Sequence, residues 1–220
     1  MRLAIFDFCE TLANYQTADA FVEFAENRYY GKSDPLKNIL NKFVCRSRVF
    51  NVLDKLFGTS INKAVVLKRI KGLSYEEIDR LAYDYYKDVV RQNLIGETIG
   101  ILKKYVSEGV RVVLISGGYD VYLRYFAEEF GINKEDVFST RVQFRNDVLT
   151  GRFEGKDCMG QEKVKILNSF FLNYQSDSIA FSDSASDKPM MYWASSRVLV
   201  LRNDRQPWDK FNKIIIWKKN

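Results

Sequence analysis

The chain has 220 residues, of which 46% are hydrophobic and 28% are charged. This size and composition suit one folded core with room for a smaller inserted domain, and they exclude an intrinsically disordered chain. The formal charge of +6 is compatible with nucleic acid, an acidic membrane surface or a small anionic ligand, so charge by itself selects no partner.

Histidine is absent from the sequence, which excludes mechanisms that need an imidazole as base, nucleophile or metal ligand. The three cysteines, Cys9, Cys45 and Cys158, lack the paired spacing of a zinc site, and we interpret them as thiols. No apolar stretch is long enough to cross a bilayer, and the N-terminal residues lead directly into a strand-like run. We therefore expect a cytoplasmic protein without membrane contact.

The first predicted element is a strand at residues 3–6, a short apolar run of the kind that a parallel sheet buries on both faces. Residues 14–95 then carry helical patterns with no buried strand between them. Within this segment, residues 33–35 resemble a helix start with proline in the first turn, and residues 74–77 have the spacing of a capping box. The segment predicts an all-helical insertion.

From residue 96 onward, strands and helices alternate. Amphipathic stripes at 97–107 and 120–130, each closed by a glycine, predict two helices. Continuous apolar runs predict three further strands, at residues 110–115, 179–181 and 198–201.

Alternating apolar positions on both sides of Asn146 and Asp147 predict a small hairpin over residues 141–153. The order of strands and helices predicts the α/β class, with a three-layer, Rossmann-like parallel sheet and right-handed crossovers. We assign residues 1–13 and 96–220 to this core and residues 14–95 to the helical insertion.

Acidic residues follow two of the predicted strands. Asp7 stands directly after the first strand, and Asp183 and Asp187 follow the run at 179–181. Because the carboxyl ends of parallel strands meet at one edge of a sheet, we expect these carboxylates to converge there. Hard cations prefer oxygen ligands, and Mg²⁺ is the natural candidate.

Phosphate-binding groups are predicted at the same edge. Ser116, Gly117 and Gly118 follow the run at 110–115 and are expected to open a helix, where a hydroxyl and free N–H groups can hold phosphate oxygens. Lys163, at the start of a helical pattern, can add a positive charge.

In order and placement these motifs resemble the four motifs of the haloacid dehalogenase superfamily, especially the branch that contains phosphoserine phosphatase. The Asp-x-Asp-x-Thr motif of that family is similar to residues 7–11, with Cys9 in place of the second aspartate. The other three motifs resemble Ser116-Gly117-Gly118, Lys163, and the Asp183 to Asp187 pair that precedes a Pro-Met dipeptide. The resemblance covers the chain end to end.

The resemblance implies a Mg²⁺-dependent phosphatase that hydrolyses a small phosphorylated metabolite through an aspartyl phosphate on Asp7, and residues 14–95 would then be a C1-type cap that governs specificity. The implied catalytic residues are Asp7, Cys9, Ser116 and Lys163. The implied phosphate contacts are Phe8, Thr11, Ser116, Gly117, Gly118 and Lys163. The implied Mg²⁺ ligands are Asp7, the main-chain carbonyl of Cys9, Asp183 and Asp187, the last of which can instead orient Lys163.

Cys9 departs from the family pattern, in which the second aspartate protonates the leaving oxygen and later deprotonates the attacking water. Three interpretations stay open: a substrate whose leaving group departs without acid help, proton transfer by Glu10 or a cap residue, or a protein that is slow or inactive and retains phosphate binding. Gln16 also stands where the branch carries a carboxylate for the substrate amine, which argues against phosphoserine.

Other functions compete with hydrolysis by a phosphatase. A phosphate-binding or regulatory protein on the same scaffold would need no proton transfer, and a phosphotransferase would pass the phosphoryl group to an alcohol instead of water. Nucleic-acid binding is the weakest alternative, because only the net charge supports it.

Overall fold

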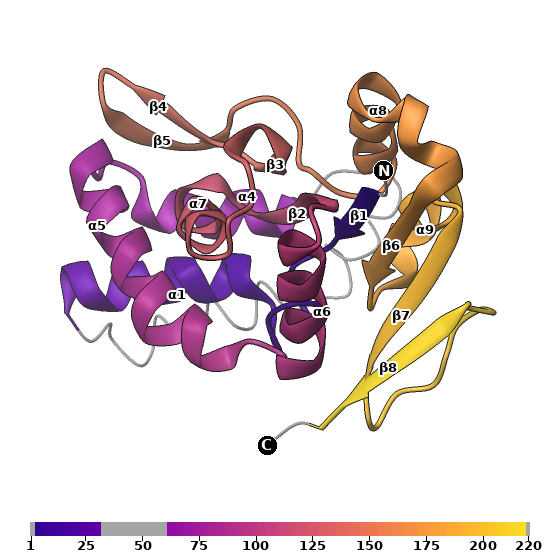
Figure 1. Ribbon diagram of the computed structural model, residues 1–220. Helices are drawn as coiled ribbons and strands as arrows, with labels where there is room; N and C mark the ends of the chain where they lie inside the picture. The colour runs from indigo at the N-terminus through magenta and orange to yellow at the C-terminus, as the bar shows by residue number, and fades with distance from the viewer. Residues whose placement is uncertain (1–2, 32–60, 219–220) are drawn as a thin grey trace.

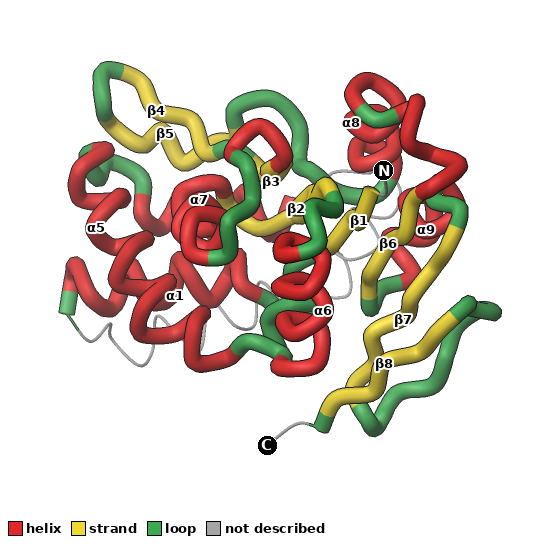
Figure 2. The backbone as a smooth tube through the Cα atoms, in the orientation of Figure 1, coloured by secondary structure: helices red, strands yellow, loops and turns green. Residues whose placement is uncertain are grey.

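The structure is a computed structural model that describes residues 3–31 and 61–218. The helix start expected at residues 33–35, and Cys45, lie outside the described residues. Figure 2 shows helices gathered around a central group of strands, with a small hairpin set apart from them.

Six parallel strands form the central sheet, in the order β3-β2-β1-β6-β7-β8. The first strand lies inside this sheet, between β2 and β6. The sheet strands are β1 (Leu3–Phe6), β2 (Arg111–Tyr119), β3 (Val137–Thr140), β6 (Ser178–Ser182), β7 (Ser196–Arg202) and β8 (Lys213–Trp217). The predicted parallel sheet is confirmed, and β3 and β8 add an unpredicted strand at each edge.

The two faces of the sheet pack against different helices because successive side chains of a strand point to opposite faces. Ala4 and Phe6 pack in one apolar cluster with residues of α6 and α7, whereas Leu3 and Ile5 pack in another with residues of α8 and α9. The three-layer α/β architecture is therefore confirmed. The α-helices of these layers are α6 (Gly96–Ser107), α7 (Asp120–Glu129), α8 (Gln161–Phe170) and α9 (Lys188–Trp193).

Three short 3-10 helices connect the elements of the core. They are η4 (Lys134–Asp136), η5 (Leu172–Asp177) and η6 (Ala185–Asp187).

The regular elements that the structure describes between β1 and α6 are all helical. Ser74 begins α5 as expected, because its Oγ accepts a hydrogen bond from the Glu77 backbone N–H (3.2 Å) and the Glu77 carboxylate accepts one from the Ser74 backbone N–H (2.8 Å). The described elements are α1 (Thr17–Tyr30), α4 (Ile61–Leu67), η1 (Lys68–Ile70), α5 (Tyr75–Tyr85), the π-helical turn η2 (Tyr86–Val90) and η3 (Arg91–Asn93).

The predicted hairpin consists of β4 (Val142–Arg145) and β5 (Val148–Phe153), and its turn residues Asn146 and Asp147 have φ of 48° and 59°. Although it follows β3 in sequence, the hairpin lies against the helical segment (Figure 1), where Leu149 exchanges backbone hydrogen bonds with Leu73 (2.8 Å) and Gly72 (2.9 Å). It therefore ties a late part of the chain to the insertion.

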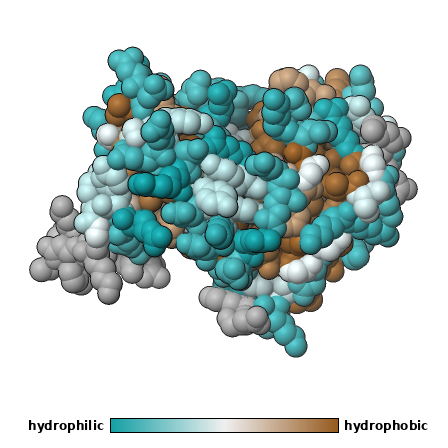
Figure 3. Space-filling view, turned by 60° about the vertical axis from the view of Figure 1, so that its left-hand side comes forward, coloured by the Kyte–Doolittle hydropathy of each residue, from teal (hydrophilic) through white to brown (hydrophobic). Residues whose placement is uncertain are grey.

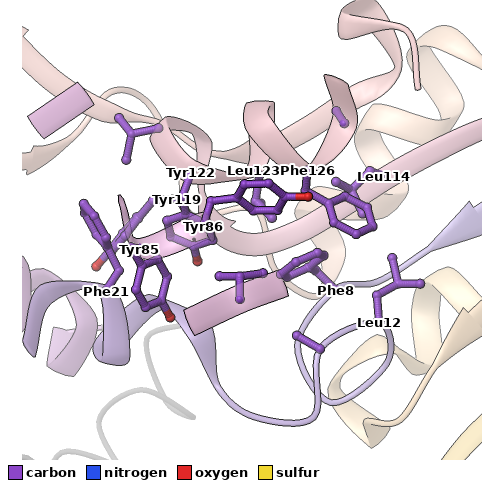
Figure 4. Packing of buried hydrophobic residues seen from close by; sticks show 14 of the residues in the cluster. Phe8, Leu12, Phe21, Tyr85, Tyr86, Leu114, Tyr119, Tyr122, Leu123 and Phe126 are labelled. Atoms are coloured by element: carbon purple, nitrogen blue, oxygen red, sulfur yellow. Dashed lines mark hydrogen bonds between the residues drawn. The ribbon is translucent and has the colours of Figure 1, made fainter. Parts of the chain in front are cut away.

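Aromatic side chains fill the space between the sheet and the helical segment (Figure 4). Phe8 lies edge-on to Phe126 with ring centroids 4.9 Å apart, and Tyr85 packs against Tyr122 and Phe21 at 5.3 and 5.4 Å. Phe8, just after β1, thus shares one core with residues of α1, α5 and α7, which fixes the helical segment above the carboxyl edge of the sheet.

The face seen in Figure 3 is mainly hydrophilic, with its hydrophobic area concentrated on one side. Within the described ranges, no helix combines the length and the apolar character that crossing a membrane requires.

Candidate active site

A cavity of about 280 Å³ opens where β1, β2 and β6 end. Asp7 enters it directly after β1, Asp183 directly after β6, and Gly117 from the last residues of β2. The parallel pairing of β1 with both neighbours brings these three strand ends together. The full lining is Asp7, Cys9, Gln16, Ala18, Asp19, Asn62, Lys63, Gly117, Met159, Lys163, Asp183, Ser184, Ser186 and Asp187.

Lys163 joins two carboxylates at the floor of the cavity. Its Nζ donates to Asp7 Oδ1 at 2.7 Å and to Asp187 Oδ2 at 2.8 Å, and all three side chains are buried. Burial acts to lower the pKa of Lys163, but the two carboxylates raise it above its ordinary value. Lys163 therefore carries a fixed positive charge beside Asp7.

Burial and the nearby Asp187 raise the pKa of Asp7 to about 6, against the opposing effect of Lys163. Burial, Asp7 and Glu10 raise the pKa of Asp183 to about 8, with Arg205 opposing. These carboxylates are crowded and poorly hydrated, which is the condition that a bound cation relieves.

Thr11 holds the two metal-ligand candidates together. Its Oγ1 lies 3.2 Å from Asp7 Oδ2 and 3.5 Å from Asp183 Oδ1, and it accepts the backbone N–H of Asp183 at 3.1 Å. Thr98 donates to the Thr11 carbonyl at 2.7 Å. Thr11 is fully buried and does not line the cavity. Its hydroxyl group therefore contacts the two carboxylates and not the space inside the cavity.

Cys9 lines the cavity, but its thiol is hydrogen-bonded toward the protein core. Its Sγ lies 3.1 Å from Thr17 Oγ1, which in turn lies 2.7 Å from the Tyr122 hydroxyl. Burial and the charge of Asp7 raise the pKa of Cys9 to about 11. The thiol is therefore protonated at neutral pH and is poorly suited to accept a proton from water.

The expectation that Ser116-Gly117-Gly118 opens a helix is wrong. These residues continue β2, and α7 begins only at Asp120. The register with β3 shifts between Ser116 and Tyr119, because the two glycines form an irregularity in the strand. The Gly118 N–H is bonded to Ser116 Oγ at 3.0 Å, and only Gly117 of the three residues lines the cavity.

The predicted site residues thus divide into two groups. Asp7, Cys9, Gly117, Lys163, Asp183 and Asp187 line one cavity. Phe8, Thr11, Ser116 and Gly118 do not line it. Phe8 packs its ring into the core, while its backbone N–H is hydrogen-bonded to the Asp7 carboxylate.

Sequence reasoning missed a cluster around Lys63, a residue of α4 in the helical segment. Lys63 Nζ donates to Asp157 Oδ1 at 2.6 Å, to Thr140 Oγ1 at 2.8 Å and to the carbonyl of Gly117. The Lys63–Asp157 pair is about nine-tenths buried on both sides. Nothing in the sequence pairs these residues, which are brought together only by the packing of α4 over the end of β2.

A second missed group lies beside Asp183. Arg205, in the loop between β7 and β8, donates to Glu10 Oε1 at 2.9 Å and to Asp183 Oδ2 at 3.4 Å. Gln16 Nε2 donates to Glu10 Oε2 at 3.0 Å. Glu10 has a positive φ of 53°, which turns its side chain away from the extended direction, and Glu10 does not line the cavity.

The donor set fits a hard divalent cation. No cluster of three or more His, Cys, Asp or Glu side chains within 3–31 and 61–218 has the geometry of a metal centre. Mg²⁺, however, is commonly held by one or two carboxylates together with substrate phosphate and water. Asp7 and Asp183, drawn together by Thr11, supply those carboxylates.

Comparisons with known proteins agree with this architecture. The family model of haloacid dehalogenase-like hydrolases matches residues 4–192. A phosphoserine phosphatase of Methanocaldococcus jannaschii is 27% identical over 202 residues, which cover 90% of this chain and 84% of that protein. A phosphoserine phosphatase of Archaeoglobus fulgidus is 24% identical over 193 residues, 86% of this chain but only 49% of that longer protein.

Solved structures share the fold. A Bordetella pertussis protein of unknown function superposes with a TM-score of 0.74 at 20% identity, covering 90% of this chain and 89% of that one. A phosphoserine phosphatase in substrate-bound form has a TM-score of 0.65 at 21% identity, with coverage of 97% and 91%. With its family match and these curated relatives, the chain belongs to the haloacid dehalogenase-like hydrolases, as a phosphohydrolase similar to phosphoserine phosphatase.

Proposed function

We propose that this protein is a Mg²⁺-dependent phosphatase that hydrolyses a small phosphorylated metabolite through an aspartyl phosphate on Asp7. The observation that carries the proposal is the meeting of Asp7, Asp183 and Lys163 in one cavity, with Lys163 2.7 Å from Asp7. A carboxylate nucleophile splits one difficult displacement into two easier steps.

Each residue of the site has a role in this proposal. Asp7 attacks phosphorus with the oxygen that Lys163 leaves free. The N–H of Gly117 and the ammonium group of Lys163 hold phosphoryl oxygens as their charge changes. Asp187 keeps Lys163 in place, a role supported by their 2.8 Å contact and by the hydrogen bond that Ser182 donates to the same Asp187 oxygen at 2.8 Å.

Asp7, Asp183 and the carbonyl of Cys9 would hold Mg²⁺, which when bound offsets the repulsion between an anionic nucleophile and an anionic phosphoryl group. The carbonyl of residue 9 is available whatever its side chain, so the Cys9 substitution leaves this donor intact. The fit is supported by Thr11, whose hydroxyl lies near both carboxylates.

Residues 14–95 act as a cap in this proposal, with residues 1–13 and 96–220 as the catalytic core. Gln16, Ala18, Asp19, Asn62 and Lys63 come from this segment and line the cavity. Substrate contacts beyond the phosphoryl group would therefore come from the insertion, which also limits the access of water.

A second candidate function is phosphate binding with little turnover. The observation in its favour is the Cys9 thiol, which is protonated at neutral pH and bonded to Thr17. In this case the same residues would hold phosphate or a phosphorylated ligand.

The deciding experiment measures phosphate release from a panel of alkyl, aryl and acyl phosphates, with Mg²⁺ and with a chelator. The proposal predicts turnover that requires Mg²⁺ and falls by roughly four orders of magnitude or more in Asp7→Asn, because an amide is no nucleophile. Wild-type protein that binds phosphate but turns over none of the panel would instead establish the second candidate.

A further inference from the structure

The proposed reaction needs a group that gives a proton to the leaving oxygen and later takes one from water. Cys9, at the position of the missing aspartate, directs its thiol to Thr17 Oγ1 at 3.1 Å, and a thiol is a weak hydrogen-bonding group. The proton-transfer residue must therefore be another acid or base that lines the cavity.

Two candidates are excluded by their contacts. The Glu10 carboxylate lies outside the cavity lining and is bonded to Gln16 and Arg205. Lys63 lines the cavity, but its ammonium group is bonded to Asp157, Thr140 and the Gly117 carbonyl. Breaking that buried cluster during each turnover would cost more than using a group that already faces the cavity.

Asp19 is the carboxylic acid that the helical segment brings to the cavity, among the residues that the structure describes. It stands in the first turn of α1, two residues after Thr17, whose hydroxyl contacts Cys9. Its carboxylate makes no hydrogen bond or ion pair with any residue in 3–31 or 61–218. An acid at this place lines the same cavity as Asp7 and Lys163 and comes from the helical segment on its other side.

The surroundings of Asp19 also suit proton transfer. Its side chain is open to the cavity, yet the protein around it removes enough water to raise its pKa, against the opposing charges of Lys63 on α4 and Arg69 on η1. Tyr119 of β2 also faces Asp19. Arg69 interacts in addition with two other acids of α1: it feels the charge of Glu23 and forms an ion pair with Glu26. A carboxyl group with a raised pKa is a better acid–base catalyst near neutral pH.

We propose, on the basis of the function proposed above, that Asp19 is the proton-transfer residue of this active site and acts in place of the carboxylate absent at residue 9. As the Asp7 oxygen bonds to phosphorus, the bond from phosphorus to the leaving oxygen breaks, and that oxygen takes the proton of the Asp19 carboxyl group. A water then gives its proton to the Asp19 carboxylate and bonds to phosphorus, while the bond between Asp7 and phosphorus breaks and phosphate leaves.

The experiment compares wild type, Asp19→Asn and Asp19→Glu on a simple alkyl phosphate and on 4-nitrophenyl phosphate, whose leaving group departs without a proton. Asp19→Asn is expected to lose about 10²-fold or more in kcat on the alkyl phosphate. On 4-nitrophenyl phosphate it should give a stoichiometric burst of nitrophenolate followed by slow turnover, because only the second step then lacks its base. Asp19→Glu should retain part of the activity.

Two controls separate this role from a structural one. Glu23→Gln, one turn further along α1, should leave both substrates unaffected, and Cys9→Asp introduced into Asp19→Asn should restore turnover of the alkyl phosphate. An acid in the first turn of a helix can also simply stabilise that helix, in which case Asp19→Asn would lower Tm without a burst and without rescue by Cys9→Asp.

The inference is overturned if Asp19→Asn keeps wild-type kcat on the alkyl phosphate, if the loss appears only in KM, or if wild type cleaves only activated phosphates. Those results leave the proposed phosphatase function standing. Wild-type protein without any phosphate turnover would overturn both, and Asp7→Asn distinguishes true turnover from contamination.

Discussion

Among single residues, Gly118 is a position with no room for a larger side chain. A Cβ atom there would lie 2.7 Å from the Tyr122 hydroxyl and 3.0 Å from Leu123 Cδ1, both of which are fully buried. Packing against α7 therefore explains the glycine at position 118 without reference to the proposed phosphate binding.

Gly118→Ala should destabilise the protein by about 1–3 kcal/mol, because the added methyl group overpacks a closed site. Gly100→Ala is the matched control: Gly100 is exposed within α6 with no atom near its added Cβ, so alanine there should raise stability by about 0.5–1 kcal/mol. Urea unfolding of both variants checks this, and shifts of the same sign would contradict it.

Asp183 allows a test of metal binding that does not depend on turnover. Because Mg²⁺ would bind only the folded protein, it should raise Tm, by an amount equivalent to about 2.7 kcal/mol at a hundredfold excess over its Kd. Asp183→Asn removes one of the two carboxylates near Thr11 and should lose most of that increase. If Mg²⁺ raised Tm by the same amount in the variant and in wild type, the ion would bind elsewhere.

At the scale of elements, α4 is joined to the core by the Lys63–Asp157 pair. Both side chains are about nine-tenths buried, so removing one partner leaves an unpaired buried charge. Lys63→Met should lower the free energy of unfolding by about 3–5 kcal/mol, and the double variant Lys63→Met/Asp157→Leu should recover part of that loss.

The control is Lys68→Met, an exposed lysine in the neighbouring helix η1, which should change stability by less than about 0.5 kcal/mol. Thermal unfolding of the three variants gives the comparison. If Lys63→Met were as mild as Lys68→Met, α4 would not depend on this pair.

The strands buried on both faces were predicted from the sequence, whereas the two edge strands were not. The inner strands β1, β2, β6 and β7 are continuous apolar runs because helices cover both of their faces. Among the four residues of β3 only Thr140 is buried, and its sequence has no continuous apolar run. β8 does contain one, at residues 214–217, although only Ile215 and Trp217 are buried, and the strand was overlooked. The helix predicted over residues 120–130 is confirmed as α7, but residues 116–118 were wrongly expected to open it, because a glycine pair can begin a helix or interrupt a strand.

At the scale of the whole molecule, the site is assembled from distant parts of the chain. The position of Asp7, Asp183 and Lys163 could be predicted because each follows a strand or begins a helix in a sheet whose carboxyl ends meet at one edge. The contacts of Lys63 and Arg205 could not be predicted from the sequence. Lys63 meets Asp157 across 94 positions and Arg205 meets Glu10 across 195, and both contacts depend on how the insertion and the last loop pack.

The proposed mechanism requires that Asp7 carries the phosphoryl group during turnover. Wild-type protein mixed with substrate and Mg²⁺, quenched in acid within one turnover and digested, should yield a phosphoryl group on the peptide that contains Asp7, and Asp7→Asn should yield none. Phosphate release at the same rate with Asp7 unmodified, or with the phosphoryl group on another residue, would contradict the account.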